Sequence, residues 1–357
     1  MKTLRRTVLV VMALAMVFAL AACNKSNDAP AAPSASSAPA ASQAPSAAPA
    51  EKITIRIGAT GARGHMVTEW MYHFADAVHA KSDKFIVEPY PAGQFGTAAE
   101  MVEAVMENNL QGVCVPTGYL AAYCPFVNIL DVPFLFPPGD AWFDILNAGI
   151  PTIIEAFREV GVYPVSWPYI SNQWVDSTVP IKSVADLKGL NTRGMNSDVW
   201  LEVYGAMGCN PVVMPTSDLP MALQQGTIDA HFGPFSIAHS MLLGIIEYFI
   251  AIPDMPMCDC IMMSDKFLQS LSAEDRDFIL KTADEVTRGA NKEYSITMTD
   301  EYLKDFEEYG IEVTYMNPTI EADLKALLLP IKENFPNKYP DLADAFYEIC
   351  AIMDAHS

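Results

Sequence analysis

The sequence predicts an α/β protein built from two domains. Its 357 residues, of which 51% are hydrophobic and 18% charged, are sufficient for two sizeable cores. Strand-like and helix-like segments alternate from residue 52 onward and again from about residue 190, which is typical of sheets flanked by helices. A mostly polar helical pattern nearer the C-terminus is long enough to brace both domains.

The first domain is expected to open with a strand over residues 52–57 and a helix over about 66–79. A second strand at 85–87, a second helix over about 96–109 and a third strand at 112–115 follow. The order strand, helix, strand, helix, strand predicts that these strands are parallel.

The loop 58–64 joins the first strand to the first helix and contains three glycines. It lacks the Lys-Ser/Thr pair of a P-loop and the Gly-x-Gly-x-x-Gly spacing of a dinucleotide fold, so we interpret it as a turn at a ligand-facing strand end. Arg63 in this loop is a candidate contact for an anion, and a solvent-facing arginine is the alternative.

The second domain follows the proline-bounded, aromatic segment 164–180. Its predicted strands are 190–193, 211–214 and 228–232. A long helix is expected over 272–309, because it opens with a Ser-x-x-Asp cap and contains little Gly or Pro.

One arginine of the second domain stands at the end of a predicted strand. Ser183 and Asp186 have the spacing of a helix cap, and Gly189 can end the short turn that they start. Arg193 then lies at a strand end, which is where open α/β domains bind ligands. In an acidic, apolar chain, this position makes Arg193 the leading candidate to bind an anion; a structural ion pair is the alternative.

The N-terminus predicts export. Positive charges before the apolar run 7–22 are typical of a signal peptide, here residues 1–22. The sequence Leu-Ala-Ala-Cys over 20–23 resembles the lipobox of bacterial lipoproteins, which predicts lipidation at Cys23. An uncleaved membrane helix is the weaker alternative, because the run is short for a span. Residues 23–51 then form an Ala/Pro/Ser tether that holds the protein at the periplasmic face of a membrane.

Charge and motifs exclude several classes of function. The formal net charge is −21, and it becomes −24 once the three basic residues of the signal are removed, so nucleic acid is not an expected partner. The six cysteines besides Cys23 form no Cys-x-x-Cys pair, which makes zinc improbable, and their disulfide connectivity stays open. Nucleophile-elbow and zinc-protease motifs are missing, so neither an enzyme nor a cofactor is expected.

Four segments in order resemble motifs of the solute-binding proteins of tripartite ATP-independent periplasmic (TRAP) transporters, of the dicarboxylate-binding type. They are Gly-Gln-Phe-Gly over 93–96, Asp-Val-Pro-Phe-Leu-Phe over 131–136, Asp-Leu-Lys-Gly-Leu-Asn-Thr-Arg over 186–193, and the segment 221–230. The likeness covers roughly residues 52–350.

The resemblance implies a two-lobed, periplasmic-binding-protein-like fold. Each lobe is expected to be a mixed sheet flanked by helices, with a long helix bridging the two. Lobe I would comprise residues 52–170 with about 259–298, and lobe II about 171–258 with 299–357. The cleft between them would close over a small organic anion.

The resemblance also implies a role for Arg193, which falls on the arginine that grips the ligand carboxylate in this family. A guanidinium fork matches a carboxylate in geometry and keeps its charge when desolvated. Two departures from the sugar-acid-binding members make the site less cationic. Gln173 replaces a second arginine, and Gly233 replaces the asparagine before a proline.

The resemblance implies further candidates. His231 and Phe232 stand where members that hold a metal have Glu-Trp, so no metal is expected. Thr216 is a candidate hydroxyl donor. Trp174 and Phe232 are candidates either for the ligand site or for the core.

The leading hypothesis is a receptor that binds a carboxylate, an oxo or hydroxy acid, or a sulfonate, and delivers it to a TRAP permease. A subunit that presents its ligand to a membrane sensor is an alternative, since it needs the same cleft and tether. An exported α/β enzyme is the third hypothesis, against which the missing catalytic motifs argue.

Overall fold

The computed structural model describes residues 52–137, 141–170, 172–195, 197–256, 258–315 and 317–356, without the side chains of 172, 173 and 251–256. The chain divides into a unit of residues 1–49 and a compact unit of residues 50–357. The predicted signal peptide and the whole tether, Cys23 included, lie outside the described residues. Every described helix and strand belongs to the compact unit.

The sheet of lobe I has five strands in the described part of the chain, in the order β2-β1-β3-β10-β4. Their bounds are β1 Ile53–Ala59, β2 Phe85–Tyr90, β3 Gly112–Pro116, β4 Val162–Ser166 and β10 Asp259–Ser264. β1 is parallel to β2 and β3, as predicted from the strand–helix alternation. β10 runs antiparallel to both β3 and β4 and makes the sheet mixed.

The sheet of lobe II has six strands among the described residues, in the order β11-β9-β5-β8-β6-β7. Their bounds are β5 Asn172–Ser177, β6 Asn191–Gly194, β7 Asn210–Val213, β8 Ala230–Gly233, β9 Tyr248–Pro256 and β11 Glu312–Thr314. β6 is parallel to β7 and β8, whereas β5 is antiparallel to β8 and β9. Both sheets are therefore mixed, as the fold class predicts.

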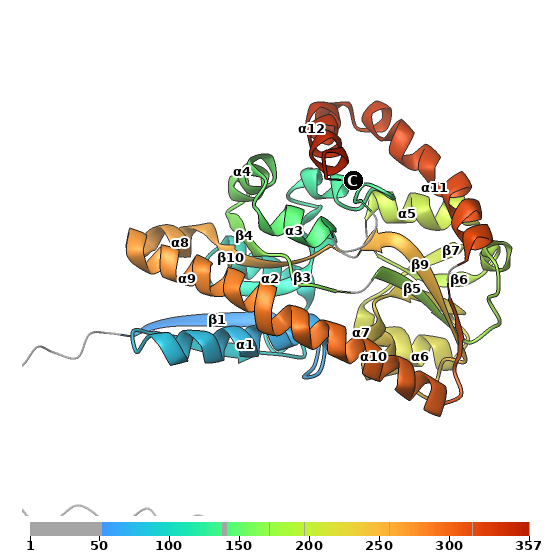
Figure 1. Cartoon of the computed structure of the whole chain (residues 1–357), viewed down its shortest axis with the longest axis horizontal. Helices are drawn as coiled ribbons and strands as arrows, with labels where there is room; N and C mark the ends of the chain where they lie inside the picture. The colour runs from blue at the N-terminus through green and yellow to red at the C-terminus, as the bar shows by residue number, and fades with distance from the viewer. Residues whose placement is uncertain are drawn as a thin grey trace, which may run out of the picture. The chain divides into compact units, whose positions relative to one another are not determined.

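Helices flank the two sheets (Figure 1). The α-helices are α1 Met66–Lys81, α2 Ala98–Met106, α3 Ala141–Asn147, α4 Pro151–Glu159, α5 Asp198–Ala206, α6 Leu219–Gln224, α7 Phe235–Ile237, α8 Asp265–Ser270, α9 Ala273–Val286, α10 Lys292–Glu308, α11 Pro318–Lys338 and α12 Ala343–Asp354. Short 3₁₀ turns are η1 Thr117–Leu120, η2 Pro125–Ile129, η3 Val184–Leu187, η4 Thr216–Asp218 and η7 Pro340–Leu342, and π-helical turns are η5 Ala238–Leu242 and η6 Thr287–Asn291.

A long helical segment bridges the lobes. The Ser272 hydroxyl accepts a hydrogen bond from the backbone N–H of Asp275 and so caps α9, as the Ser-x-x-Asp pattern predicts. α9, η6 and α10 follow one another without a break. α9 packs on α1 and β4 of lobe I, while α10 packs on α7 and β11 of lobe II (Figure 1). The predicted bridging helix is confirmed, but the exact lobe boundaries stay a prediction.

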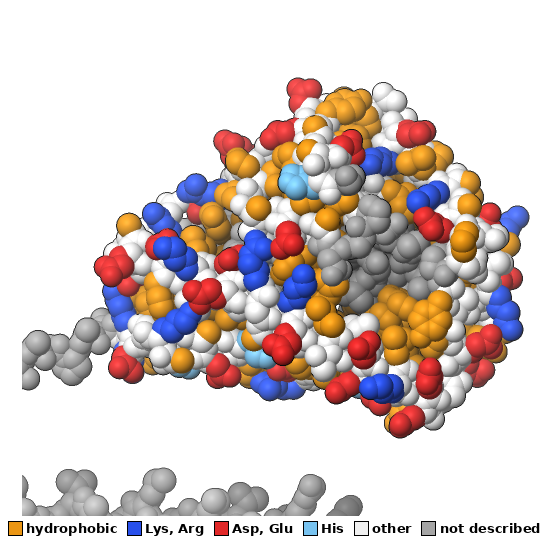
Figure 2. Space-filling view, in the orientation of Figure 1, with side chains coloured by type: hydrophobic (Ala, Val, Ile, Leu, Met, Phe, Trp, Pro, Cys, Tyr) orange, Lys and Arg blue, Asp and Glu red, His pale blue; other side chains and the backbone are white. Residues whose placement is uncertain are grey.

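The cores are apolar, and the surface in view mixes both signs of charge. Acidic and basic side chains are interspersed over the face shown in Figure 2, as expected for an acidic, soluble surface rather than a basic patch. All six cysteines of the described residues are free thiols, five of them buried. No helix within the described ranges combines the length and the apolar character that crossing a membrane requires.

Candidate functional site

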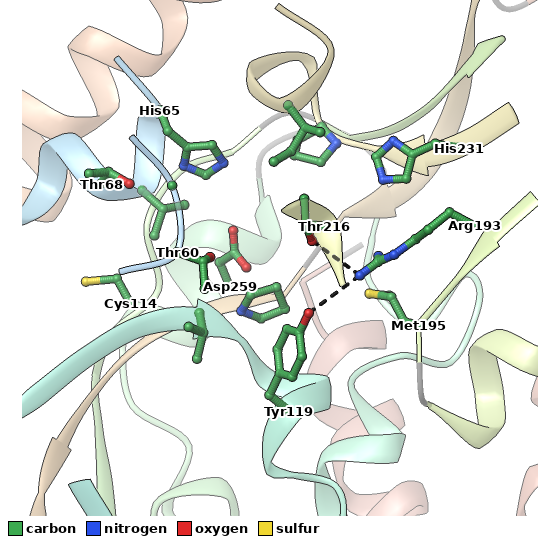
Figure 3. A pocket seen from close by; sticks show the side chains of 16 residues that line it. Thr60, His65, Thr68, Cys114, Tyr119, Arg193, Met195, Thr216, His231 and Asp259 are labelled. Carbon is green, nitrogen blue, oxygen red and sulfur yellow. Dashed lines mark hydrogen bonds between the residues drawn. The ribbon is translucent and has the colours of Figure 1, made fainter. Parts of the chain in front are cut away.

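A cavity of about 50 Å³ lies between the two lobes (Figure 3). The strand ends of both sheets and the loops that follow them form its wall. Lobe I contributes Thr60, Gly61, His65, Val67, Thr68, Cys114, Val115, Pro116, Tyr119 and Asp259, and lobe II contributes Arg193, Met195, Thr216, His231, Pro234 and Ile237. The wall therefore carries one arginine, one aspartate and two histidines in an otherwise neutral lining.

The local fold that places Arg193 begins at the predicted cap. The Ser183 hydroxyl and the Asp186 carboxylate cap each other's backbone N–H groups, which starts the turn η3. Gly189 ends it with a φ of +85°, a conformation that favours glycine. The chain then enters β6 between two parallel neighbours, where Arg193 is only 4% exposed.

The guanidinium of Arg193 is held by neutral acceptors. Its Nε donates to the carbonyl oxygen of Met214 at 3.2 Å, and Nη2 donates to Thr216 Oγ1 at 3.3 Å and to the Tyr119 hydroxyl at 3.5 Å. The Nη2 distances exceed the usual length of about 2.9–3.0 Å, so these two bonds are weak. Nη1 makes no hydrogen bond to any described residue.

Arg193 also lacks a counter-ion within the described ranges. No Asp or Glu among those residues comes within ion-pair distance of its guanidinium. An ion taken out of water without a partner costs several kcal/mol, and arginine cannot escape by losing its proton. A buried, unpaired guanidinium that lines a cavity is therefore arranged to receive an anion.

His231 lies beside Arg193, because the two residues are register partners on the parallel strands β8 and β6. Its Nδ1 lies 2.9 Å from Oδ1 of Asp176, and both side chains are almost fully buried. Asp176 thereby orients the imidazole ring. The ring packs over Gly233: a Cβ at this position would lie 2.2 Å from His231 Cε1, so only glycine leaves room for the histidine.

The lobe I wall is built around the loop that precedes α1. A Cβ on Gly61 would lie 2.6 Å from Thr68 Oγ1 and 2.8 Å from His65 Cγ, so the loop needs glycine to pass these side chains. Burial lowers the pKa of His65 to about 4, which keeps its imidazole neutral at pH 7. His65 Nδ1 and Thr68 Oγ1 are buried and have no hydrogen-bond partner in the described part of the chain.

Asp259 is the acid of this wall. It begins β10 and is 4% exposed, and burial raises the pKa of its carboxyl to about 7. Its Oδ1 is another buried oxygen without a partner among the described residues.

The structure brings three of the sequence-predicted site residues together at the cavity: Arg193, Thr216 and His231. Gly233 supports the His231 ring instead of lining the cavity. The side chain of Gln173 lies outside the described residues.

The other candidates lie outside the cavity wall in this structure, on the alternatives that the sequence left open. Trp174 packs with Phe235 and Phe249 in the core of lobe II, because its strand presents it to that aromatic cluster. Phe232 is 1% exposed and packs on Tyr204. The Arg63 side chain is 59% exposed, and its Nε lies 3.1 Å from Glu69 Oε1. Arg63 is therefore a solvent-facing arginine in this structure.

Sequence reasoning placed the loop 58–64 at a ligand-facing strand end but named none of the lobe I side chains that line the wall. The polar ones are Thr60, His65, Thr68, Tyr119 and Asp259. One signal was available: Asp259 is the only charged residue in the segment 255–263, which is otherwise apolar. The other four residues stand in loops and helix ends where polar side chains are common, so no local pattern singles them out.

Comparison with known proteins identifies relatives of the whole compact unit. The model of the family described as bacterial extracellular solute-binding protein, family 7, matches residues 57–338. The 2,3-diketo-L-gulonate-binding periplasmic protein YiaO of Escherichia coli (strain K12) is 26% identical over 262 residues, which are 71% of this chain and 78% of YiaO. The C4-dicarboxylate-binding periplasmic protein DctP of Shewanella loihica is 25% identical over 267 residues, 73% of this chain and 79% of that protein.

A solved structure has the same fold. A TRAP periplasmic solute-binding protein from Desulfovibrio salexigens with bound orotic acid superposes with a TM-score of 0.79 at 21% sequence identity, covering 86% of this chain and all of the other.

Proposed function

Because the chain belongs to family 7 of the bacterial extracellular solute-binding proteins, we propose that it is an extracytoplasmic receptor for a small organic anion. The anion binds in the cavity between the lobes, and a TRAP permease receives it from the receptor. The ligand classes that fit are a carboxylate, an oxo or hydroxy acid, and a sulfonate.

The observation that carries this proposal is the state of Arg193. Its guanidinium is buried at the cavity and lacks a carboxylate partner among the described residues. The two hydrogens on Nη1 are available, and the long bond from Nη2 to Thr216 Oγ1 is readily exchanged for one to a charged acceptor. Two parallel N–H···O bonds to one carboxylate or sulfonate give the guanidinium a counter-ion and use its available N–H hydrogens.

The relatives support the class of ligand. The names of YiaO and of the Shewanella protein specify an oxidised sugar acid and C4-dicarboxylates, and the Desulfovibrio protein was solved with orotic acid. These compounds differ in size and shape but share an acid group. The shared acid group is the one that we propose Arg193 binds in this chain.

The direct test is the affinity of an Arg193→Ala variant for organic acids that stabilise the wild type, measured by calorimetry. Removing one member of a buried, hydrogen-bonded charge pair costs about 2–5 kcal/mol, so the dissociation constant should rise at least about 30-fold. Arg63→Ala is the matched control, because it also removes one arginine, and it should bind like the wild type. Undiminished binding by Arg193→Ala in correctly folded protein would refute the proposed role.

We also propose that the mature protein is a lipoprotein attached through Cys23, with residues 24–51 as its tether. The support is the Leu-Ala-Ala-Cys sequence after an apolar run that basic residues precede. A Cys23→Ser variant, expressed in a bacterial host, should lose incorporation of labelled palmitate and leave the membrane fraction. Membrane attachment and labelling equal to those of the wild type would contradict the anchor.

A further inference from the structure

Asp259 is a buried acid that nothing in the described protein neutralises. It starts β10 opposite Pro116 of β3, at the strand ends that face the cavity. Figure 3 places it on the lobe I side and Arg193 on the lobe II side. Neither of its carboxyl oxygens has a hydrogen-bond partner, and no Lys or Arg is within ion-pair distance, among the described residues.

The groups around Asp259 supply no positive charge. On β3 and β10 the nearby titratable groups are the thiols of Cys114, Cys258 and Cys260, whose pKa values burial raises, so they stay neutral. His65 in the loop before α1 is neutral because burial lowers its pKa to about 4. The carboxyl must therefore stay protonated or meet a cation from outside the chain.

Arg193 and Asp259 line one cavity but do not pair with each other. Their charged atoms are farther apart than the 4.0 Å that defines an ion pair. A buried guanidinium and a buried carboxyl that line one small cavity, held apart and each without a partner in the described chain, are satisfied together by one compact ligand that carries both signs. An anion without a cationic group pairs with Arg193 and leaves Asp259 protonated.

We propose that the ligand is a small zwitterion, whose acid group binds Arg193 and whose cationic N–H group binds Asp259. This inference rests on the proposed function, since it assigns the second half of the same ligand. The lobe I wall fits an ammonium or an amidinium. Asp259 Oδ1, Thr68 Oγ1 and His65 Nδ1 are buried atoms without partners in the described chain, and each can accept a hydrogen bond.

The test uses pairs of compounds that differ only in an amino group: β-alanine and propionate, γ-aminobutyrate and butyrate, taurine and ethanesulfonate. Each is titrated by calorimetry into the wild type, Arg193→Ala, Asp259→Asn and Asp277→Asn, all freed of carried-over ligand by unfolding and refolding. Asp277→Asn is the control for the change in net charge, because Asp277 lies on the surface of α9 in a pair with Lys281.

At least one amino compound should bind the wild type at least tenfold more tightly than its partner without the amino group. Asp259→Asn should abolish or reverse this preference. Arg193→Ala should weaken the binding of both compounds of the pair. Asp277→Asn should bind both compounds with the affinities of the wild type.

If the compounds without the amino group bind as well as or better than their partners, and Asp259→Asn leaves them unchanged, the zwitterion inference is overturned while the anion receptor stands. Failure of every pair also overturns the zwitterion inference. The proposed receptor function is then tested by a separate screen, in which dicarboxylates, oxo acids and sugar acids are added to the wild type and its thermal stability is measured. If none of them stabilises the protein, the proposed function is refuted too.

Discussion

Two residues without side chains shape the cavity. Gly61 leaves space for Thr68 and His65 on one wall, and Gly233 leaves space for the His231 ring on the other. In both places an added Cβ would meet a ring atom or a branched side chain at less than 3 Å, so a neighbouring side chain would have to move. The geometry of the site thus depends on the absence of a side chain at Gly61 and Gly233 as well as on Arg193 and Asp259.

Asp259 makes a further prediction at the residue scale, on the stability of the ligand-free protein. Its pKa is about 7 in the folded state against an ordinary value of 3.8, so folding favours the protonated acid. Its contribution to stability is fully present below pH 3.8 and is lost as the pH rises to 7. The loss corresponds to a free energy on the order of 4 kcal/mol.

Asp259→Asn should therefore unfold at higher urea concentration than the wild type at pH 8, and the difference should be much smaller at pH 4.5, where most of the contribution of Asp259 is retained. Urea unfolding at both values measures the difference. Asp131, whose pKa is raised to about 6, and His65, whose pKa is lowered to about 4, also change stability with pH. They do so in both proteins, so the difference isolates Asp259. Equal midpoints at pH 8 would contradict a buried, unpaired carboxylate.

At the scale of elements, the π-helical turn η6, in the middle of the bridging helical segment, makes hydrogen bonds to lobe I. The Thr287 hydroxyl accepts from Trp70 Nε1 at 2.8 Å, donates to the Ala283 carbonyl at 2.8 Å and lies against the hydroxyl of Ser166. Asn291, one turn later, donates from Nδ2 to the Met66 carbonyl at 3.1 Å. The wider turn directs these polar side chains into the contact with α1 and β4, where they are fully buried.

Thr287→Val should lower the free energy of unfolding by about 1–3 kcal/mol, because it keeps the shape of the side chain but leaves the buried Trp70 N–H without an acceptor. Thr299→Val on α10 is the control. Among the described residues its hydroxyl bonds only to the Ser295 carbonyl one turn away, so its loss should cost less. Chemical unfolding of both variants tests the prediction, and equal losses would mean that the Thr287 hydrogen bonds do not matter.

At the scale of the whole compact unit, several side-chain hydrogen bonds join the lobes, and two of them involve Asp131 and Arg193. The Ser197 hydroxyl, at the start of α5, donates to Asp131 Oδ2 at 2.8 Å, and Asp131 belongs to the segment between β3 and β4. The second contact is the hydrogen bond from Arg193 Nη2 to the Tyr119 hydroxyl. Both depend on the lobes standing close together, so they stabilise the closed arrangement.

A Tyr119→Phe, Ser197→Ala double variant should close less readily. Each hydrogen bond contributes about 0.5–1.5 kcal/mol, so ligand affinity should fall by roughly 5- to 100-fold, mainly through faster release. Stopped-flow binding measures the rates, and small-angle scattering of the ligand-free double variant should show a larger radius of gyration than that of the wild type. Thr299→Val, which does not line the cavity, again serves as control. An unchanged rate of ligand release would show that these two hydrogen bonds do not stabilise the closed arrangement of the lobes.

Much of this protein can be predicted from its sequence, because the relevant information is local. Periodicity and turn residues located β1, β2, β3, β6, β7 and β8 within a few residues, and a Ser-x-x-Asp pattern marked the true start of α9. Arg193 was identifiable because a cap, a glycine turn and a short strand stand side by side in the chain. Such signals need only neighbouring residues and their backbone preferences.

The tertiary structure decided what Arg193 faces. β10 returns from far along the chain to pair antiparallel with β3 and β4, and this pairing alone carries Asp259 to the cavity. It also decided that Trp174 and Phe232 fill the core, while His231, next to Phe232, points to the cavity, because alternate residues of a strand face opposite sides. Local sequence encodes the elements, whereas the meeting of two buried, opposite, unpaired charges arises only when distant strands pack across one cavity.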